Sequence, residues 1–135
     1  MRFTLPLFLV FALWGCSSTP DSIPEDLGAH EYFQKAQEAL VEFNDYSTAL
    51  LYYETFLERF PTDLQKIVEA EYEIGFIHYK MGDTERASLL FNNLLDRYKA
   101  EGSEVLPRWP QTLAEKVLSN IEGESEEPES TTAEE

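Results

Sequence analysis

Two stretches of seven residues decide the fold of this chain: FNDYSTA at residues 43–49 and MGDTERA at residues 81–87. Each stretch places a residue that tolerates left-handed backbone, Asn44 or Gly82, directly before an aspartate. Asp45 and Asp83 are good N-cap residues for a following helix. Each stretch therefore predicts the end of one helix, a tight turn and the start of a second helix.

The similarity between the two stretches continues along the helix that follows each turn. The alanines that end the two stretches, Ala49 and Ala87, are 38 positions apart, and the next apolar residues keep that spacing. The paired positions are Ala49 and Ala87, Tyr53 and Phe91, and Phe56 and Leu94. An internal repeat of this length is typical of stacked helical units. The sequence therefore predicts an all-α array of two helix–turn–helix repeats, at about residues 30–61 and 68–99.

The paired positions resemble the tetratricopeptide repeat, which implies a right-handed α-solenoid. The matching residues are Ala49, Tyr53 and Pro61 in the first unit and Ile74, Gly75, Ala87 and Phe91 in the second. Gln37, His78 and Lys99 depart from the pattern. The longer spacing and the phrase Arg59-Phe60-Pro61 resemble the repeats of bacterial envelope lipoproteins. Examples are the repeat lipoprotein of outer-membrane β-barrel assembly and the Tol-associated coordinator of cell division.

Five helices are predicted inside a domain of residues 26–121. Their expected ranges are about 26–42, 45–59, 63–80, 84–100 and 111–121. Pro110 suits the first position of the last helix. That helix places Leu113, Val117, Leu118 and Ile121 on one side, so we expect it to cap the array, which is short for this architecture.

The first fifteen residues have the character of an export signal. A basic start is followed by a short apolar run, which ends in Leu13-Trp14-Gly15-Cys16. This ending resembles the box of bacterial lipoproteins, and the resemblance implies that Cys16 carries lipid, palmitate included, on its sulfur and its amine. Residues 16–25 would then be a tether. The alternative is an incidental thiol in a leader that ordinary signal peptidase removes.

The charge of the chain limits its partners. The formal net charge is −16, and residues 122–135 are acidic without a base, a composition that predicts a disordered tail. The tail is solvated or, alternatively, a docking strand for a basic partner. Nucleic acid should be repelled, because its binding depends on Lys and Arg. We expect membrane attachment through the lipid alone, at the periplasmic face of the outer membrane, since Ser17 and not Asp follows Cys16.

No catalytic arrangement is visible in the sequence. His30 and His78 are the only histidines, and neither lies in a metalloprotease motif or beside a nucleophile. Glu69, Glu71 and Glu73 alternate, which scatters them around a helix instead of gathering them for a metal. We therefore expect no enzyme, no metal, no cofactor other than the covalent lipid, and no small-molecule substrate. A minor enzyme or metal protein is the outlying alternative.

The resemblance to the repeat family implies that the first helix of each unit lines a concave, partner-binding face. The positions implied are Glu31, Gln34, Glu38, Val41 and Glu42 in the first unit, and Glu69, Tyr72, Phe76, Tyr79 and Lys80 in the second. Tyr72, Phe76 and Tyr79 form one stripe beside an acidic rim. This combination suits a basic peptide or helix from another envelope protein. Alternatively, the stripe is buried beneath the last helix, near Leu113 and Val117. For Trp109 we expect packing against the second unit.

These observations lead to a non-enzymatic, lipid-anchored adaptor as the first functional hypothesis. Outer-membrane protein assembly and coordination of division with the cell wall are the two settings that the resemblance implies. The second hypothesis is a structural envelope lipoprotein that self-associates through the ends of its array.

Overall fold

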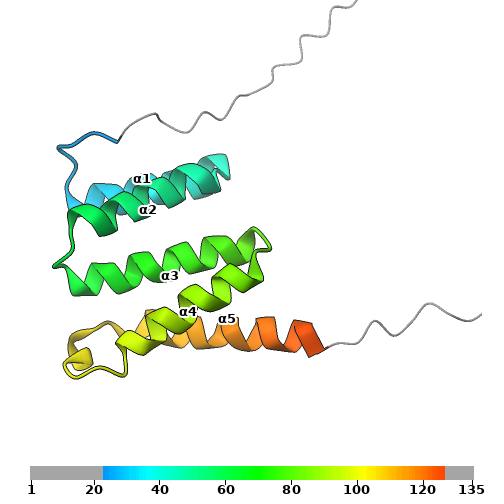
Figure 1. Ribbon diagram of the computed structural model, residues 1–135. Helices are drawn as coiled ribbons and strands as arrows, with labels where there is room; N and C mark the ends of the chain where they lie inside the picture. Colours follow the sequence, from blue (N-terminus) through cyan, green and yellow to red (C-terminus); the bar gives the residue numbers. More distant parts are fainter. Residues whose placement is uncertain (1–22, 127–135) are drawn as a thin grey trace, which may run out of the picture.

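The computed structural model describes residues 23–126, which form five α-helices and one 3₁₀ turn without any strand. The helices stack in chain order, and the two ends of the described chain lie at opposite ends of the stack (Figure 1). The elements are α1 (Ala29–Phe43), α2 (Tyr46–Arg59), α3 (Leu64–Lys80), α4 (Thr84–Arg97), η1 (Ser103–Val105) and α5 (Arg108–Glu126). The predicted all-α repeat array is confirmed.

The two predicted turns have the expected geometry. Asn44 and Gly82 adopt left-handed backbone, with φ of 50° and 81°. Asp45 accepts a hydrogen bond from the Thr48 amide at 3.0 Å, and Asp83 accepts one from the Arg86 amide at 3.1 Å. Each aspartate therefore caps the helix that follows its turn.

The core consists of two clusters that share α3. The first cluster joins α1, α2 and α3, whereas the second joins α3, α4 and α5. All six paired positions of the two repeats are at most 1% exposed: Ala49, Tyr53, Phe56, Ala87, Phe91 and Leu94. The two units therefore bury equivalent residues in equivalent places.

The small residue expected at Gly75 has a clear physical purpose. A Cβ atom added there would lie 2.8 Å from the ring of Phe91, closer than side-chain carbons approach one another. The equivalent pair in the first unit, Gln37 and Tyr53, is joined by a hydrogen bond of 2.7 Å from the Gln37 amide to the Tyr53 hydroxyl. The first unit thus replaces close packing by a polar contact at the same position.

The N-terminal boundary of the domain differs from the prediction. The first helix begins at Ala29 rather than at residue 26, and the predicted tether of residues 16–25 is wrong at its C-terminal end. Ile23 is buried in the first core cluster, and the carbonyl of Pro24 accepts a hydrogen bond of 2.7 Å from Arg59. Apolar burial and this bond hold the segment against the domain. Residues 1–22, which include Cys16, lie outside the described residues.

The C-terminal half contains three further corrections. The fourth helix ends at Arg97 instead of residue 100, and α5 begins at Arg108 instead of residue 111. Pro110 is therefore the third residue of α5, where proline is tolerated because amides of a first turn have no intrahelical acceptor. Ala114 takes the buried position, while Leu113, predicted to face the core, is 38% exposed.

The predicted disordered tail of residues 122–135 is wrong over its first part, because α5 continues to Glu126. Extending a formed helix costs little, and glutamate is a good helix former, so the acidic composition does not prevent the extension. Residues 127–135 lie outside the described residues.

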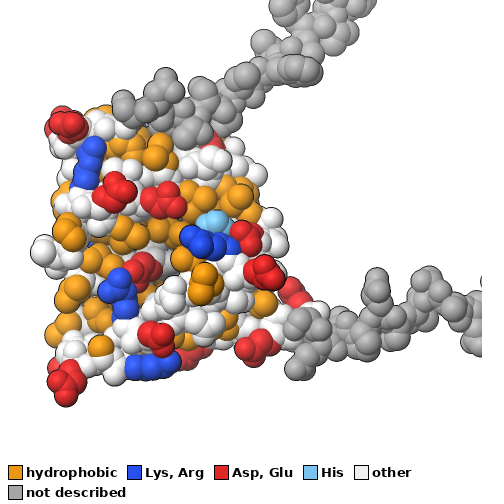
Figure 2. Space-filling model, viewed as in Figure 1, with side chains coloured by type: hydrophobic (Ala, Val, Ile, Leu, Met, Phe, Trp, Pro, Cys, Tyr) orange, Lys and Arg blue, Asp and Glu red, His pale blue; other side chains and the backbone are white. Residues whose placement is uncertain are grey.

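The face of the described chain drawn in Figure 2 is mainly acidic and apolar. Figure 2 shows carboxylates distributed among apolar side chains, with basic side chains scattered between them instead of gathered into a patch. None of the helices within residues 23–126 combines the length and the apolar character that crossing a bilayer requires.

Candidate partner-binding surface

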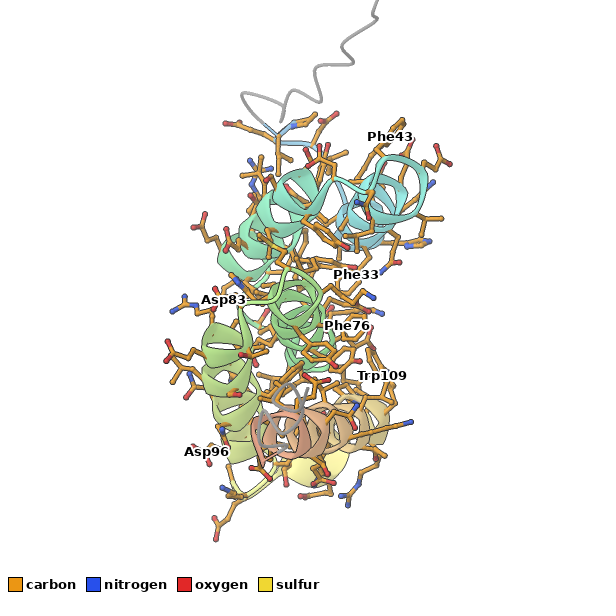
Figure 3. The ribbon with its side chains drawn as sticks, turned by 90° about the vertical axis from the view of Figure 1, so that its right-hand side faces the viewer. Phe33, Phe43, Phe76, Asp83, Asp96 and Trp109 are labelled. Atoms are coloured by element: carbon orange, nitrogen blue, oxygen red, sulfur yellow. The ribbon has the colours of Figure 1, made fainter. Side chains whose placement is uncertain are left out.

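One side of the stack carries aromatic side chains from three alternate helices, α1, α3 and α5. Phe33 of α1, Phe76 of α3 and Trp109 of α5 point to the same side in Figure 3, whereas Asp83 and Asp96 lie on the opposite side. We call the side that carries Phe33, Phe76 and Trp109 the first-helix face, because α1 and α3 are the first helices of their units.

The aromatic half of the first-helix face lies between α3 and α5. Tyr72 stacks on Phe76 with ring centroids 5.9 Å apart, and the ring of Trp109 meets Tyr72 edge-on at 5.2 Å. Tyr72 also contacts Phe91 of the core at 5.7 Å and is only 6% exposed. Trp109 is 39% exposed, and Phe76 and Tyr79 are half-buried.

The predicted stripe therefore divides between core and surface. Tyr72 lies in the second core cluster with Val117, as the alternative of burial under the last helix expected. Its buried ring offers little area to a partner. Phe76 and Tyr79 border the same cluster and keep part of their surface accessible. Trp109 packs against the second unit as expected.

The charged half of the first-helix face lies between α1 and α3. The ammonium of Lys66 is 4.9 Å from the centre of the Phe33 ring and forms an ion pair with Glu69 at 2.5 Å. A cation placed over an aromatic ring and beside a carboxylate gains from both contacts. This part of the surface therefore accommodates a cation between an aromatic ring and a carboxylate.

Glu73 lies one turn beyond Glu69 on α3 and is half-buried. No hydrogen bond or ion pair to its carboxylate is found among residues 23–126. Burial raises the pKa of Glu73, and the neighbouring charge of Glu69 raises it further. Burial likewise raises the pKa of Tyr53, with the charge of Glu73 as the next cause. The carboxylate of Glu73 is thus in an environment that favours an added positive charge.

The acidic rim predicted on α1 lies elsewhere. Glu31, Glu38 and Glu42 are displaced from Phe33 by about half a turn around α1, since each residue advances a helix by about 100°. Glu31 instead accepts a hydrogen bond of 2.7 Å from the Gly28 amide, and Glu38 pairs with Lys35 at 2.8 Å. The remaining predicted positions, Gln34, Val41, Glu42 and Lys80, are exposed.

Several residues of the first-helix face escaped the sequence analysis. Phe33, Gln37, Glu73 and Leu113 were not predicted to line it. The spacing of four residues from Glu69 to Glu73, and from Trp109 to Leu113, is the signal that could have indicated two of them. The signal for Phe33 is absent from the local pattern, because its role depends on Lys66 from another helix.

A second feature of the surface is a pocket of about 170 Å³ between the N-terminal end of α3 and the α4–α5 connection, near η1. Apolar side chains of α3 and the α4–α5 connection form much of its wall, and Arg97 at its edge is engaged by Glu71 in two hydrogen bonds of 2.6 and 2.7 Å. The lining residues are Leu64, Val68, Arg97, Ala100, Glu101, Gly102, Ser103 and Leu106.

Groups suited to catalysis or metal binding are not assembled in the part of the chain that the structure describes. Within residues 23–126, no three His, Cys, Asp or Glu side chains come together in a way that could hold a metal ion. His78 lies near the second turn, with its buried Nδ1 3.4 Å from the Asp83 carboxylate. Its Nδ1 has no hydrogen-bond partner among residues 23–126.

The fold and this surface define a class: an all-helical repeat array with an aromatic and charged face. Residues 69–100, which cover most of α3 and all of α4, match the tetratricopeptide repeat family. The chain is also 33% identical over 100 residues to an uncharacterized protein of Treponema pallidum (strain Nichols). That match covers 73% of this chain and 40% of the relative, so the chain spans less than half of the relative's length. No solved structure matches the chain.

A tetratricopeptide repeat is therefore present over α3 and α4, in the unit where the sequence pattern is most complete. Proteins with such repeats are in general non-enzymatic adaptors that bind other proteins. This class agrees with the aromatic and charged first-helix face.

Proposed function

We propose that this chain is a lipid-anchored, non-enzymatic scaffold that binds a protein partner in the bacterial cell envelope. The observation that carries the proposal is the half-exposed aromatic surface of Phe76 and Trp109 on a helical repeat array. Aromatic anchors with a polar surround are typical of protein-binding sites. The partner is a peptide or helix of another envelope protein, and outer-membrane protein assembly is the setting that we propose.

The lipid anchor in this proposal is Cys16, at the end of the short apolar leader. Two or more acyl chains hold a protein on a membrane durably, because each buried CH₂ contributes about 0.8 kcal/mol. The acidic surface and the net charge of −16 support attachment through lipid rather than through anionic headgroups. The proposed location is the periplasmic face of the outer membrane.

Coordination of division with cell-wall synthesis remains the alternative setting for the same scaffold. The second alternative is a structural lipoprotein that self-associates through the ends of its array. The outer side of α5 does not favour such stacking. That side is exposed and polar, with Thr112, Glu115, Ser119 and Glu122.

Substitution of Cys16 tests the anchor. We expect Cys16→Ser to move the protein from the membrane fraction to the soluble fraction without changing its melting temperature. The measurement is fractionation of cell envelopes followed by a high-salt wash and immunoblotting. Retention of the Cys16→Ser protein in the washed membranes would show that the anchor proposal is wrong.

Capture of a partner tests the scaffold. Crosslinking in envelopes, with the wild-type protein and with the Cys16→Ser variant as the matched control, should yield a defined partner whose recovery depends on the anchor. A wild-type protein that crosslinks only to itself would favour the structural alternative.

A further inference from the structure

We propose that the first-helix face recognises a segment in which a basic side chain lies next to an apolar one. Glu73 would receive the ammonium or guanidinium group beside the ring of Phe76, and Trp109 and Leu113 would receive the apolar side chain. The inference rests on the proposed protein-binding function and names the chemistry of the partner.

The chain itself supplies a precedent for the cation position. Lys66 lies over the ring of Phe33, at 4.9 Å from its centre, and pairs with the carboxylate of Glu69. One carboxylate and one aromatic ring on this face therefore hold an ammonium group together.

Glu73 and Phe76 present a carboxylate and an aromatic ring again, and within residues 23–126 no cation is paired with either group. They are three residues apart on α3, so their side chains lie on the same face of the helix. Neither Lys80 nor Lys116, the other bases near this face, forms an ion pair with Glu73. A basic side chain from a partner would supply the missing charge in a half-buried place, where the attraction is stronger than in open water.

The proposed apolar position lies on the α5 side of α3, in the aromatic half of the first-helix face. Trp109 and Leu113 are four residues apart on α5 and therefore lie on the same face of that helix, where they are 39% and 38% exposed. Tyr72 connects Trp109 to Phe76 of α3, because its ring contacts both of these rings. The buried ring of Tyr72, the neighbour of Glu73 in the chain, thus supports the exposed ring of Trp109 from the core side.

Charge complementarity selects the basic segment over an acidic one. The whole chain has 26 acidic and 10 basic residues, so a basic segment is attracted over a distance as well as at Glu73. An acidic segment would meet repulsion at Glu73 and Glu69. The occupant is therefore a basic–apolar segment of another protein.

Three fluorescein-labelled peptides test the inference with the full-length chain: GSKLLSG, GSELLSG and GSKSSSG. We expect GSKLLSG to bind most tightly by fluorescence anisotropy, and each of the other two to bind at least about fivefold more weakly. Added salt should weaken the binding of GSKLLSG, since one contact is ionic. Equal binding of all three peptides would overturn the inference, as would the absence of binding by GSKLLSG.

Substitutions at the cation position and at the apolar position test whether the peptide binds to the first-helix face. Glu73→Gln should weaken the binding of GSKLLSG by about fivefold to tenfold. Leu113→Ser should also weaken the binding of GSKLLSG, without affecting the binding of GSKSSSG. The matched control is Glu54→Gln, which removes the same charge from an exposed position on α2. An equal loss in Glu54→Gln and Glu73→Gln would overturn the assignment to Glu73.

Thermal melting separates binding from folding in this test. Burial raises the pKa of Glu73 in the folded protein, so ionisation of this carboxyl group does not stabilise the folded chain relative to the unfolded one. Glu73→Gln should therefore weaken the binding of the peptide without lowering the melting temperature at pH 7. If the wild-type chain captured an envelope partner but none of the three peptides bound, this inference would be rejected. The proposed scaffold function would still be supported.

Discussion

Gly75 shows how a single residue sets the distance between two helices. Its missing side chain leaves room for the ring of Phe91, which would otherwise lie 2.8 Å from a Cβ atom. Phe91 is fully buried and surrounded by α3, α4 and α5, so it has little freedom to move away. The first unit instead accommodates Gln37, whose amide reaches the hydroxyl of Tyr53. The two units thus use equivalent positions for the contact between their helices, although one contact is close apolar packing and the other is a hydrogen bond.

We expect Gly75→Ala to lower the free energy of unfolding by about 1–2 kcal/mol. Overpacking against Phe91 costs about 1–3 kcal/mol, and the better helix propensity of alanine offsets up to about 1 kcal/mol of this. Urea denaturation followed by circular dichroism measures the change.

Gly123→Ala is the matched control, because it lies in α5 and a Cβ atom there meets nothing within 4 Å. Its stability should be unchanged or slightly higher. If both variants were equally stable, the close contact between Gly75 and Phe91 would not limit the packing.

At the scale of elements, α5 occupies the place of the first helix of a third unit. It packs on α4 about as extensively as α3 packs on α2, and it also contacts α3. The connection before it is held by hydrogen bonds from Tyr98 to the Pro107 carbonyl at 2.8 Å and from Gln65 to the Val105 carbonyl at 3.0 Å. Its outer side is polar, as expected for a helix that ends a repeat array.

Truncation of the chain after Tyr98 should therefore be strongly destabilising. Without α5, apolar side chains of the second core cluster would meet water, and each large one contributes about 1.5–3 kcal/mol when fully buried. We expect a loss of more than about 3 kcal/mol in the free energy of unfolding, measured by denaturant titration.

A chain that ends at Glu126 is the control for this truncation, since it keeps α5 whole. It should melt at the temperature of the full-length protein. A chain ending at Tyr98 that kept that melting temperature would contradict the role of α5 as a cap.

At the scale of the whole molecule, two core clusters that meet in α3 join the units into one stack. Both ends of the stack are polar, because Glu31, Lys35 and Glu38 cover the outer side of α1 and polar residues cover that of α5. Stacking of a second copy would bury these charges, and the exposed apolar side chains at the α1 end are Val41 and Phe43 at the end of the helix.

We therefore expect the Cys16→Ser protein to be monomeric in solution. Sedimentation velocity over a hundredfold range of concentration should give one species with the mass of a single chain. A mass that rises with concentration would instead favour the self-associating alternative.

The sequence alone determined the turns and the repeat, because these depend on local chemistry: Asn44 and Gly82 for left-handed backbone, aspartates for capping, and paired apolar positions for the core. It left open whether Tyr72 belongs to a binding face, and the acidic rim that it predicted on α1 lies about half a turn from Phe33. Only the tertiary structure decided these points, since burial of Tyr72 depends on Trp109, 37 positions away in the chain. In the same way, the cation over Phe33 comes from α3. Periodicity within one helix carries no information on which neighbour will cover each face.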